Sequence, residues 1–357
     1  MSELDRKDSH LEICLNEKVE SALFQNLSQA YHVYAPASAF HHYRFDHDAL
    51  PEIDKSQVDL TATLFGKKLS APLIIGAMTG GTEHASRIND RLALAAQKCQ
   101  VGFALGSQRK MLEKPSTVSS YAVKKSAPNL PLLIGNLGAV QLNYGVGVPE
   151  IKQLIEAVEC DVFSFHLNPL QEAIQPEGNT NFSGLLLKLK TVISETSIPV
   201  LVKEVGCGIS EITAEKLSML PLAGIETAGL GGTSWSKIES LRASNKIQKT
   251  TGELFSMWGI PTAESILNCR KFFPQRTVIA SGGIRNGIEI AKSLALGADA
   301  VALALPFLKA AECSAEAVVE VIERLLEELR TVMFLTGSKN IANLKLKELK
   351  KTMDYTQ

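Results

Sequence analysis

Two apolar, strand-like runs near the end of this chain each lead into a turn, and the first turn contains two adjacent glycines. Val278–Ala280 is followed by Gly282 and Gly283, and Ala300–Ala304 is followed by Leu305. A strand, a glycine turn and a helix, then a second strand and turn, is how the last two units of a (β/α)8 barrel bind a phosphate. Glycine also closes ordinary tight turns, because it tolerates positive φ. The segment predicts a phosphate-binding barrel, and a simple turn remains the alternative.

The rest of the chain supplies the other six strands that such a barrel needs. Apolar, β-branched runs alternate with segments of helical character. Eight strands within about 240 residues fit one barrel of ordinary size. The predicted strands are Pro72–Ile75, Val101–Leu105, Leu132–Gly135, Val162–Phe165, Pro199–Val202, Gly224–Glu226, Val278–Ala280 and Ala300–Ala304. The predicted helices between them include Ala85–Cys99, Glu150–Glu159, Ser183–Thr196 and Ile284–Leu296.

The predicted fold class is therefore α/β, a (β/α)8 TIM barrel with an N-terminal arm and a C-terminal helical tail. We expect one domain over residues 1–357, with the arm over 1–70, the barrel over 71–310 and the helices over 311–357. A long insertion near Trp235–Trp258 interrupts the pattern, and long loops of this kind commonly carry substrate contacts. The tail segment Leu344–Lys351 predicts an amphipathic helix.

Composition indicates an enzyme that acts on small molecules. The formal net charge is -1, which gives no reason to expect nucleic acid or a membrane as a partner. The N-terminus has no apolar signal region and the longest apolar run, Ala300–Leu308, is shorter than a membrane span, so we expect a cytoplasmic protein. The cysteines lack paired spacing, which favours buried free thiols over disulfides or a zinc site. They are Cys14, Cys99, Cys160, Cys207, Cys269 and Cys313.

The predicted strands end in glycines or polar residues. Catalytic groups of such barrels lie at the carboxyl ends of the strands. Any one of these ends could be a turn with satisfied polar groups, but six together predict a binding site. The segments are Gly76–Gly81, Gly106–Arg109, Gly135–Gly138, Phe165–Asn168 continuing to Gly178, Lys203–Glu204 and Gly229–Trp235.

Short motifs in a fixed order cover nearly the whole chain. They are Arg6–His10, His47–Asp54, Met78–Gly81, Ser107–Arg109, His166–Asn168, Gln171–Glu172, Gly231–Thr233, Trp258–Thr262 and Thr336–Asn340. In this order they resemble the type 2 isopentenyl diphosphate isomerases, FMN-dependent enzymes that interconvert isopentenyl and dimethylallyl diphosphate. Each motif is weak alone, but the ordered set is specific.

The resemblance implies a role for individual residues. The flavin would be surrounded by Ala77, Met78, Thr79, Ser107, Asn136, Lys203, Thr227 and Thr233, and its phosphate would be held by Gly283, Ile284, Arg285, Ala304 and Leu305. The substrate would face Arg6, Lys7, His10, Ser107, Gln108, Arg109, His166, Asn168 and Gln171, and Glu172 would bind Mg²⁺. The family also implies NADPH as the reductant of FMN and a homo-oligomer, a tetramer or octamer.

The residues themselves agree with these roles. Lys203 follows a buried Val-Leu-Val run, where a cation is costly unless it meets a charge, and an anionic reduced flavin would be that charge. Arg6, Lys7 and Arg109 suit a diphosphate, although charged termini are commonly only solvated. Glu172 offers the hard oxygen that Mg²⁺ prefers, with a surface salt bridge as the alternative.

The implied reaction protonates an alkene at one carbon and removes a proton from another, without net redox change. A side-chain amide is a poor acid or base, so we expect reduced flavin to act as acid/base, with Gln171 positioning the substrate or relaying a proton. His166 is the other candidate, although a strand-end histidine can be merely hydrogen-bonded. Lys203 is the third predicted catalytic residue, through its contact with the flavin. NADPH would serve only to reduce FMN.

The chain departs from the family pattern at two positions. Ala228 stands where a serine is expected, so a hydroxyl contact to flavin is lost or supplied by Thr227. Asn179 stands where the family usually has aspartate. Neither position touches the expected chemistry.

Three other functions fit the barrel less well. An FMN-dependent 2-hydroxy acid oxidase needs a histidine late in the barrel, and this chain has none after His166. A flavin-free barrel that acts on a sugar phosphate would be colourless when purified. A non-catalytic scaffold would have no reason to gather polar groups at the strand ends.

Overall fold

Eight parallel strands close into a barrel in the computed structural model, which describes residues 36–352. They follow one another around the barrel in chain order, and the last strand pairs with the first. The predicted TIM barrel is confirmed, and strand ends differ from the predicted ones by at most three residues. The strands are β4 (Leu73–Ile75), β5 (Gly102–Ala104), β6 (Leu133–Gly138), β7 (Val162–His166), β8 (Val200–Lys203), β9 (Gly224–Glu226), β10 (Thr277–Ser281) and β11 (Ala300–Leu303).

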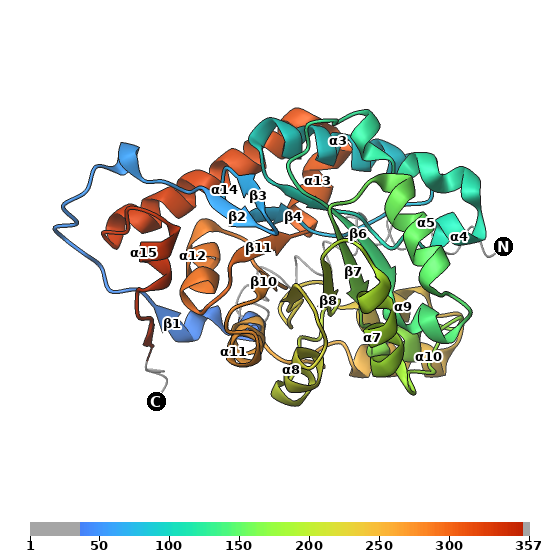
Figure 1. The fold of residues 1–357 in the computed structure, drawn as a ribbon. Coiled ribbons are helices and arrows are strands. Elements are labelled where there is room, and N and C mark those ends of the chain that lie inside the picture. Colours follow the sequence, from blue (N-terminus) through green and yellow to red (C-terminus); the bar gives the residue numbers. More distant parts are fainter. Residues whose placement is uncertain (1–35, 353–357) are drawn as a thin grey trace.

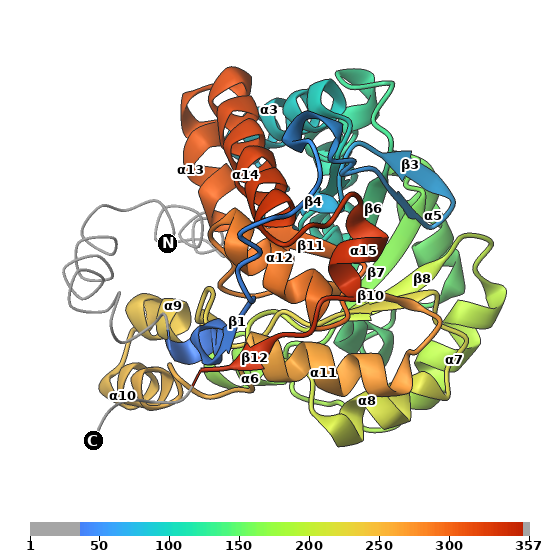
Figure 2. The same ribbon diagram turned by 90° about the vertical axis from the view of Figure 1, so that its left-hand side faces the viewer.

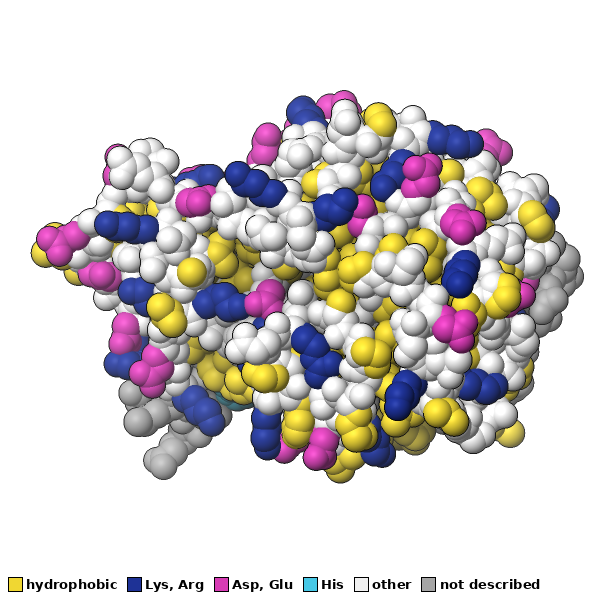
Figure 3. Space-filling view, viewed as in Figure 1, with side chains coloured by type: hydrophobic (Ala, Val, Ile, Leu, Met, Phe, Trp, Pro, Cys, Tyr) yellow, Lys and Arg dark blue, Asp and Glu magenta, His cyan; other side chains and the backbone are white. Residues whose placement is uncertain are grey.

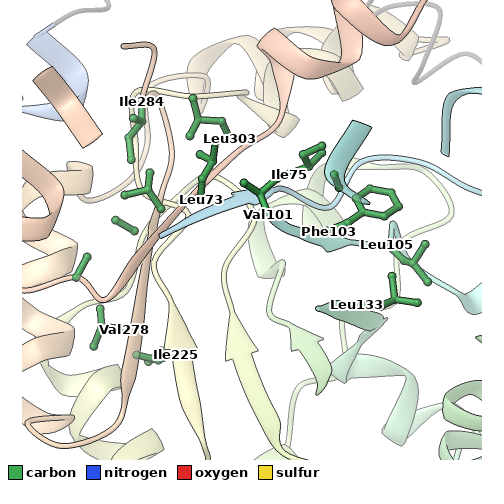
Figure 4. Packing of buried hydrophobic residues seen from close by; sticks show 14 of the residues in the cluster. Leu73, Ile75, Val101, Phe103, Leu105, Leu133, Ile225, Val278, Ile284 and Leu303 are labelled. Carbon is green, nitrogen blue, oxygen red and sulfur yellow. The ribbon is translucent and has the colours of Figure 1, made fainter. Parts of the chain in front are cut away.

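Helices surround the barrel (Figure 1), as the alternating pattern of the sequence predicted. Strand residues that point outward, such as Ile75, Phe103 and Leu133, pack against them (Figure 4). The helices after the barrel strands are α3 (Glu83–Cys99), α4 (Arg109–Glu113), α5 (Val148–Val158), α6 (Pro169–Ile174), α7 (Leu185–Glu195), α8 (Glu211–Ser218), α11 (Thr262–Phe272), α12 (Gly287–Ala295) and α13 (Leu305–Cys313). Short 3-10 helices are η1 (Pro36–Ser38), η2 (Phe40–His42), η3 (Lys55–Gln57), η4 (Pro115–Ser120), η5 (Val123–Lys125) and η6 (Ala139–Asn143).

A hairpin before the barrel closes its amino-terminal end. It consists of β2 (Ala62–Leu64) and β3 (Lys67–Leu69), which pair antiparallel. Leu64 and Leu69 are buried in the cluster of inward-pointing strand residues. Lys67 forms an ion pair with Asp161, the residue before β7. This part of the predicted arm therefore plugs the end of the barrel opposite the carboxyl ends of its strands.

The segment 235–258 folds into two helices. These are α9 (Trp235–Arg242) and α10 (Lys246–Leu254), which pack against each other. Each begins where a side chain caps the free N–H groups of the first turn, Ser234 for α9 and Asn245 for α10. The insertion is thus helical, and it lies after β9 at the carboxyl ends of the barrel strands.

The C-terminal region is helical only in part. Helix α14 (Ala315–Leu335) packs along α12 and α3 and buries one apolar stripe (Figure 1). The helix predicted over 344–351 is wrong, because α15 (Ile341–Lys345) ends there and Lys350–Lys351 forms β12. Strand β12 pairs antiparallel with β1 (Tyr43–Arg44; Figure 2). Pairing with β1 and the ion pair between Lys350 and Asp46 favour an extended backbone over another helical turn.

The cysteines within residues 36–352 are free, but the predicted burial is confirmed only for Cys160 and Cys269 and is wrong for Cys313, which is exposed. Burial raises the pKa of the Cys160 and Cys269 thiols to about 12, so both stay protonated. Among the described helices, none combines the length and the apolar character that crossing a membrane requires. Basic and acidic side chains are interspersed over the face shown in Figure 3.

Candidate active site

A cavity of about 670 Å³ opens at the carboxyl ends of the barrel strands. Side chains alternate along a strand, and five of the strands bring a polar side chain into the cavity near their carboxyl ends. These residues lie near the carboxyl ends of β6, β7, β8, β9 and β10, and all five line the cavity: Asn136, His166, Lys203, Glu226 and Ser281. The cavity is therefore walled by polar side chains and floored by the apolar interior of the barrel.

The structure brings together most residues that the sequence suggested. Those that line the cavity are Ala77, Met78, Thr79, Ser107, Arg109, Asn136, His166, Asn168, Gln171, Glu172, Lys203, Thr233, Gly283, Ile284, Arg285, Ala304 and Leu305. Gln108 and Thr227 do not line it, and Arg6, Lys7 and His10 lie outside the described residues.

The Gln108 side chain is fully buried and bonded to the backbone. Its Oε1 accepts a hydrogen bond from the Asn136 N–H at 2.8 Å, and its Nε2 donates to the Leu154 carbonyl at 3.1 Å. These bonds tie the loop after β5 to β6 and α5. Within the described chain, Gln108 thus supports the cavity wall rather than facing a ligand directly.

Thr227 joins two strands below the cavity. Its hydroxyl donates to the Ser281 carbonyl and accepts from the Ser281 N–H, both at 3.0 Å. It therefore does not replace the hydroxyl missing at Ala228. Ser281 brings a hydroxyl to the cavity from the neighbouring strand, and that hydroxyl accepts from the Ala228 N–H at 3.0 Å.

His166 is held as a neutral imidazole. Its Nδ1 lies 3.0 Å from Oδ1 of Asn136, whose Nδ2 donates to the Leu105 carbonyl. With this orientation of the amide, Nδ1 carries the hydrogen and Nε2 keeps its lone pair. Burial, together with the positive charge of Lys203, lowers the pKa of His166 to about 3. His166 can accept a hydrogen bond but is not a cationic acid near neutral pH.

Three side chains at the start of α6 are connected by hydrogen bonds. The helix begins with Pro169, and Asn168 precedes it. Nδ2 of Asn168 donates to Oε1 of Gln171 at 3.1 Å and to Oε1 of Glu172 at 2.9 Å. Oδ1 of Asn168 is buried and accepts no hydrogen bond within the described chain.

Glu172 carries the only carboxylate in this group, and its other oxygen is also bonded. Oε2 accepts from Nε2 of Gln175 at 2.9 Å and from the Asn179 N–H at 2.6 Å. Across residues 36–352, no cluster of three or more His, Cys, Asp or Glu could hold a metal alone. A cation beside Glu172 would take its remaining ligands from water and substrate phosphates, as Mg²⁺ commonly does.

Lys203 meets a carboxylate that the sequence interpretation missed. Nζ lies 3.7 Å from Oε1 of Glu226 and donates to the Glu204 carbonyl at 2.6 Å. Glu226 was predicted as the end of a strand but was given no role. Its position offered a signal, because a carboxylate at the inward end of a buried strand needs a partner.

Two glycine loops form another part of the cavity wall. Gly282 and Gly283 have φ of +106° and +73°, and a Cβ at Gly282 would lie 2.2 Å from the Gly229 carbonyl oxygen. A Cβ at Gly232 would lie 2.8 Å from the Gly283 nitrogen. The loops thus pack backbone to backbone, so the turn requires glycine whether or not a phosphate binds. Helix α13 begins beside them, with no side chain capping its first turn at Ala304.

Curated relatives resemble the chain over almost its full length. A protein from Nostoc named isopentenyl-diphosphate delta-isomerase is 46% identical over 340 residues, 95% of this chain and 93% of the relative. The chain belongs to the isopentenyl-diphosphate delta-isomerase family. A family member from Rickettsia bellii is 44% identical over 350 residues and 98% of each chain. The family and the enzyme class predicted from the sequence, an isomerase, are confirmed.

Two further comparisons concern the barrel. The FMN-dependent dehydrogenase family matches residues 186–351. A mandelate oxidase variant, whose structure contains an FMN adduct, superposes with a TM-score of 0.64 over 89% of this chain and 91% of its own. At 18% identity, this likeness to an oxidase establishes the fold alone.

Proposed function

We propose that this protein interconverts isopentenyl and dimethylallyl diphosphate with FMN that NADPH has reduced and with Mg²⁺ on the diphosphate. One observation carries the proposal: His166, Asn168, Gln171 and Lys203 face the same cavity as the paired glycine loops. The relatives at 44–46% identity support the substrate. The FMN-dependent dehydrogenase match supports the cofactor.

The cavity fits an FMN group. The loop at 283–285 and the start of α13 at Ala304 and Leu305 would hold the phosphate, because helix starts and glycine turns offer N–H groups to anions. The flat ring would lie against Ala77–Thr79, with Lys203 near it. Asn136, Ser107 and Thr233 would complete the enclosure. Bound FMN in its reduced form would supply the acid/base chemistry that an alkene demands.

The side chains of the wall would position the substrate. Gln171 accepts from Asn168, so its NH2 group is the part left for a ligand, and an amide at neutral pH donates a hydrogen bond without giving up a proton. His166 presents a neutral nitrogen, as its pKa of about 3 requires. Both groups could align the substrate without adding charge beside a developing carbocation.

The diphosphate would lie at the cavity mouth. Arg109 lines the mouth and pairs with Glu113 at 2.7 Å, so it would exchange that carboxylate for phosphate. Glu172 would bring Mg²⁺ to the same diphosphate. Arg6, Lys7 and His10 would contact it from the N-terminal arm. We further propose a single FMN-binding domain over 1–357, a homo-oligomer of four or eight copies, and a cytoplasmic location.

The first test is a visible spectrum of the purified protein with FMN. It is followed by anaerobic incubation with isopentenyl diphosphate, Mg²⁺ and excess NADPH, and by an assay for dimethylallyl diphosphate. Flavin-dependent and Mg²⁺-dependent product is the expected result. Bound flavin without product would indicate an FMN enzyme of another specificity. Absence of flavin binding would overturn the proposal.

Exchange of Gln171 for asparagine tests the role of the amide. Gln171→Asn shortens the side chain by one methylene and withdraws its NH2 group. We expect turnover to fall about 100-fold, because misplacement by about 1 Å can cost this much. FMN affinity should be unchanged. Turnover close to wild type would show that Gln171 has no direct part in the reaction.

A further inference from the structure

Three titratable side chains lie in a row across neighbouring strands. His166 on β7 is in register with Lys203 on β8, and Lys203 is in register with Glu226 on β9. Residues in register on parallel strands point to the same side of the sheet. All three therefore face the cavity at one height, in the order neutral, positive, negative.

Because Lys203 and Glu226 are both buried, each charge needs the other for compensation. Lys203 is 7% exposed and Glu226 is 6% exposed. A buried cation or carboxylate costs much free energy unless an opposite charge and hydrogen bonds compensate for lost water. The 3.7 Å between Nζ and Oε1 brings the two charges together. Ser281 donates to the same Oε1 at 2.8 Å, which fixes the carboxylate from the far side.

The neighbouring carboxylate, Glu204, does not take this role. Its Oε2 accepts hydrogen bonds from the N–H groups of three successive residues, 205 to 207, and is held in that loop. Lys203 reaches only the main-chain carbonyl of Glu204. Glu226 is consequently the carboxylate that pairs with Lys203, and it is also the one of the two that lines the main cavity.

We propose that Glu226 is a positioning residue that holds the Lys203 ammonium at the cavity wall and neutralises its charge there. The wall would then present a neutral Lys–Glu pair instead of a free cation. A free cation would favour the anionic reduced flavin strongly over the oxidised one, and the pair moderates that preference. Glu226 thus sets the redox balance of the bound cofactor, a role that rests on the proposed function.

A double-mutant cycle on the FMN-free, full-length protein tests the pairing itself. Unfolding by urea is measured for wild type, E226Q, K203M and the double variant. E226Q leaves the buried Lys203 ammonium uncompensated, so we expect the equilibrium constant for unfolding of this variant to be at least ten times that of wild type. In the K203M background, where the cation is absent, the same exchange should raise the equilibrium constant for unfolding far less. Equal effects of E226Q in both backgrounds would overturn the pairing.

Flavin affinities test the effect on the cofactor. Dissociation constants of oxidised and reduced FMN are measured for wild type, E226Q, E226D and E83Q. We expect E226Q to raise the ratio of the dissociation constant of oxidised FMN to that of reduced FMN about tenfold. This change corresponds to a shift of about 30 mV in the two-electron reduction potential of the bound flavin. E226D keeps the charge and should stay near wild type. E83Q is the control for the loss of a carboxylate near the cavity. Glu83 lies at the cavity rim and is 93% exposed, so water screens the charge that E83Q removes and the ratio should stay near wild type.

The outcomes separate this inference from the proposed function. A purely structural Glu226 would weaken both redox forms of FMN equally and leave the ratio within twofold of wild type, and that result would overturn the inference. Failure of wild type to bind FMN or to form product would overturn the proposed function instead. In that case the double-mutant cycle still decides whether Glu226 pairs with Lys203.

Discussion

Nδ2 of Asn168 donates a hydrogen bond to Oε1 of Gln171 at 3.1 Å and a second one to Oε1 of Glu172 at 2.9 Å. One amide thereby fixes both the side chain that would meet the substrate and the carboxylate that would meet Mg²⁺. It also determines the direction of the Gln171 amide, whose carbonyl oxygen is occupied. The Gln171 amide and the Glu172 carboxylate are therefore coupled through their shared donor, Asn168.

Removal of the Asn168 amide should impair turnover more than FMN binding. In Asn168→Ala, Gln171 and Glu172 lose their shared donor, and we expect kcat to fall about 10- to 100-fold because positioning is lost. Steady-state kinetics with a flavin titration measures both effects. The control is Gln175→Ala, since the Gln175 side chain donates to Glu172 and makes no hydrogen bond to the Gln171 side chain, and its main-chain bond to Gln171 survives the exchange. Equal losses in the two variants would contradict a role for the Asn168–Gln171 bond.

The sequence predicted the barrel because its strands and helices follow from local patterns, and the family resemblance named most of the residues that the structure brings to the cavity. Alternation along buried strands places Lys203 at a strand end and inside the barrel, and the structure agrees. Partner choice was not predictable, because only the closed barrel brings Glu226 beside that lysine. Gln108 and Thr227 bond to backbone groups of distant strands. The tail at 344–351 depends on β1, about 300 residues earlier, so its amphipathic pattern predicted the wrong structure.

The titration of His166 should make the fold less stable in acid. An unfolded chain protonates this imidazole near pH 6.5, whereas the folded protein does so only near its lowered pKa of about 3. Between these values the unfolded state binds one proton more, so the free energy of unfolding decreases as pH falls. His166→Gln should remove up to one proton equivalent from that slope, measured by urea unfolding between about pH 4 and 6. An unchanged slope would show that His166 titrates normally in the folded protein.

The packing of the glycine loops predicts an unequal effect of two alanine substitutions. Gly282 and Gly145 both have positive φ, +106° and +90°, so alanine is strained at each. Only at Gly282 does a Cβ meet backbone, at 2.2 Å from the Gly229 carbonyl oxygen, whereas nothing lies within 4 Å at Gly145. We expect Gly145→Ala to cost about 1 kcal/mol and Gly282→Ala to cost more than about 3 kcal/mol and to weaken FMN binding. Chemical denaturation and a flavin titration compare them. Similar costs at both positions would mean that the loops separate easily.

The hairpin at the bottom of the barrel should stabilise the fold without affecting the cavity. Leu64 is buried among inward-pointing strand residues at the end opposite the site. Leu64→Ala leaves a void there, and we expect it to lower the free energy of unfolding by about 2–5 kcal/mol. Leu50→Ala, at a side chain that is 75% exposed, is the matched control and should change it by less than about 0.5 kcal/mol. The FMN dissociation constant should match wild type in both variants at a temperature where each is folded. A large loss of FMN affinity in folded Leu64→Ala would show that the plug and the cavity are coupled through the barrel interior.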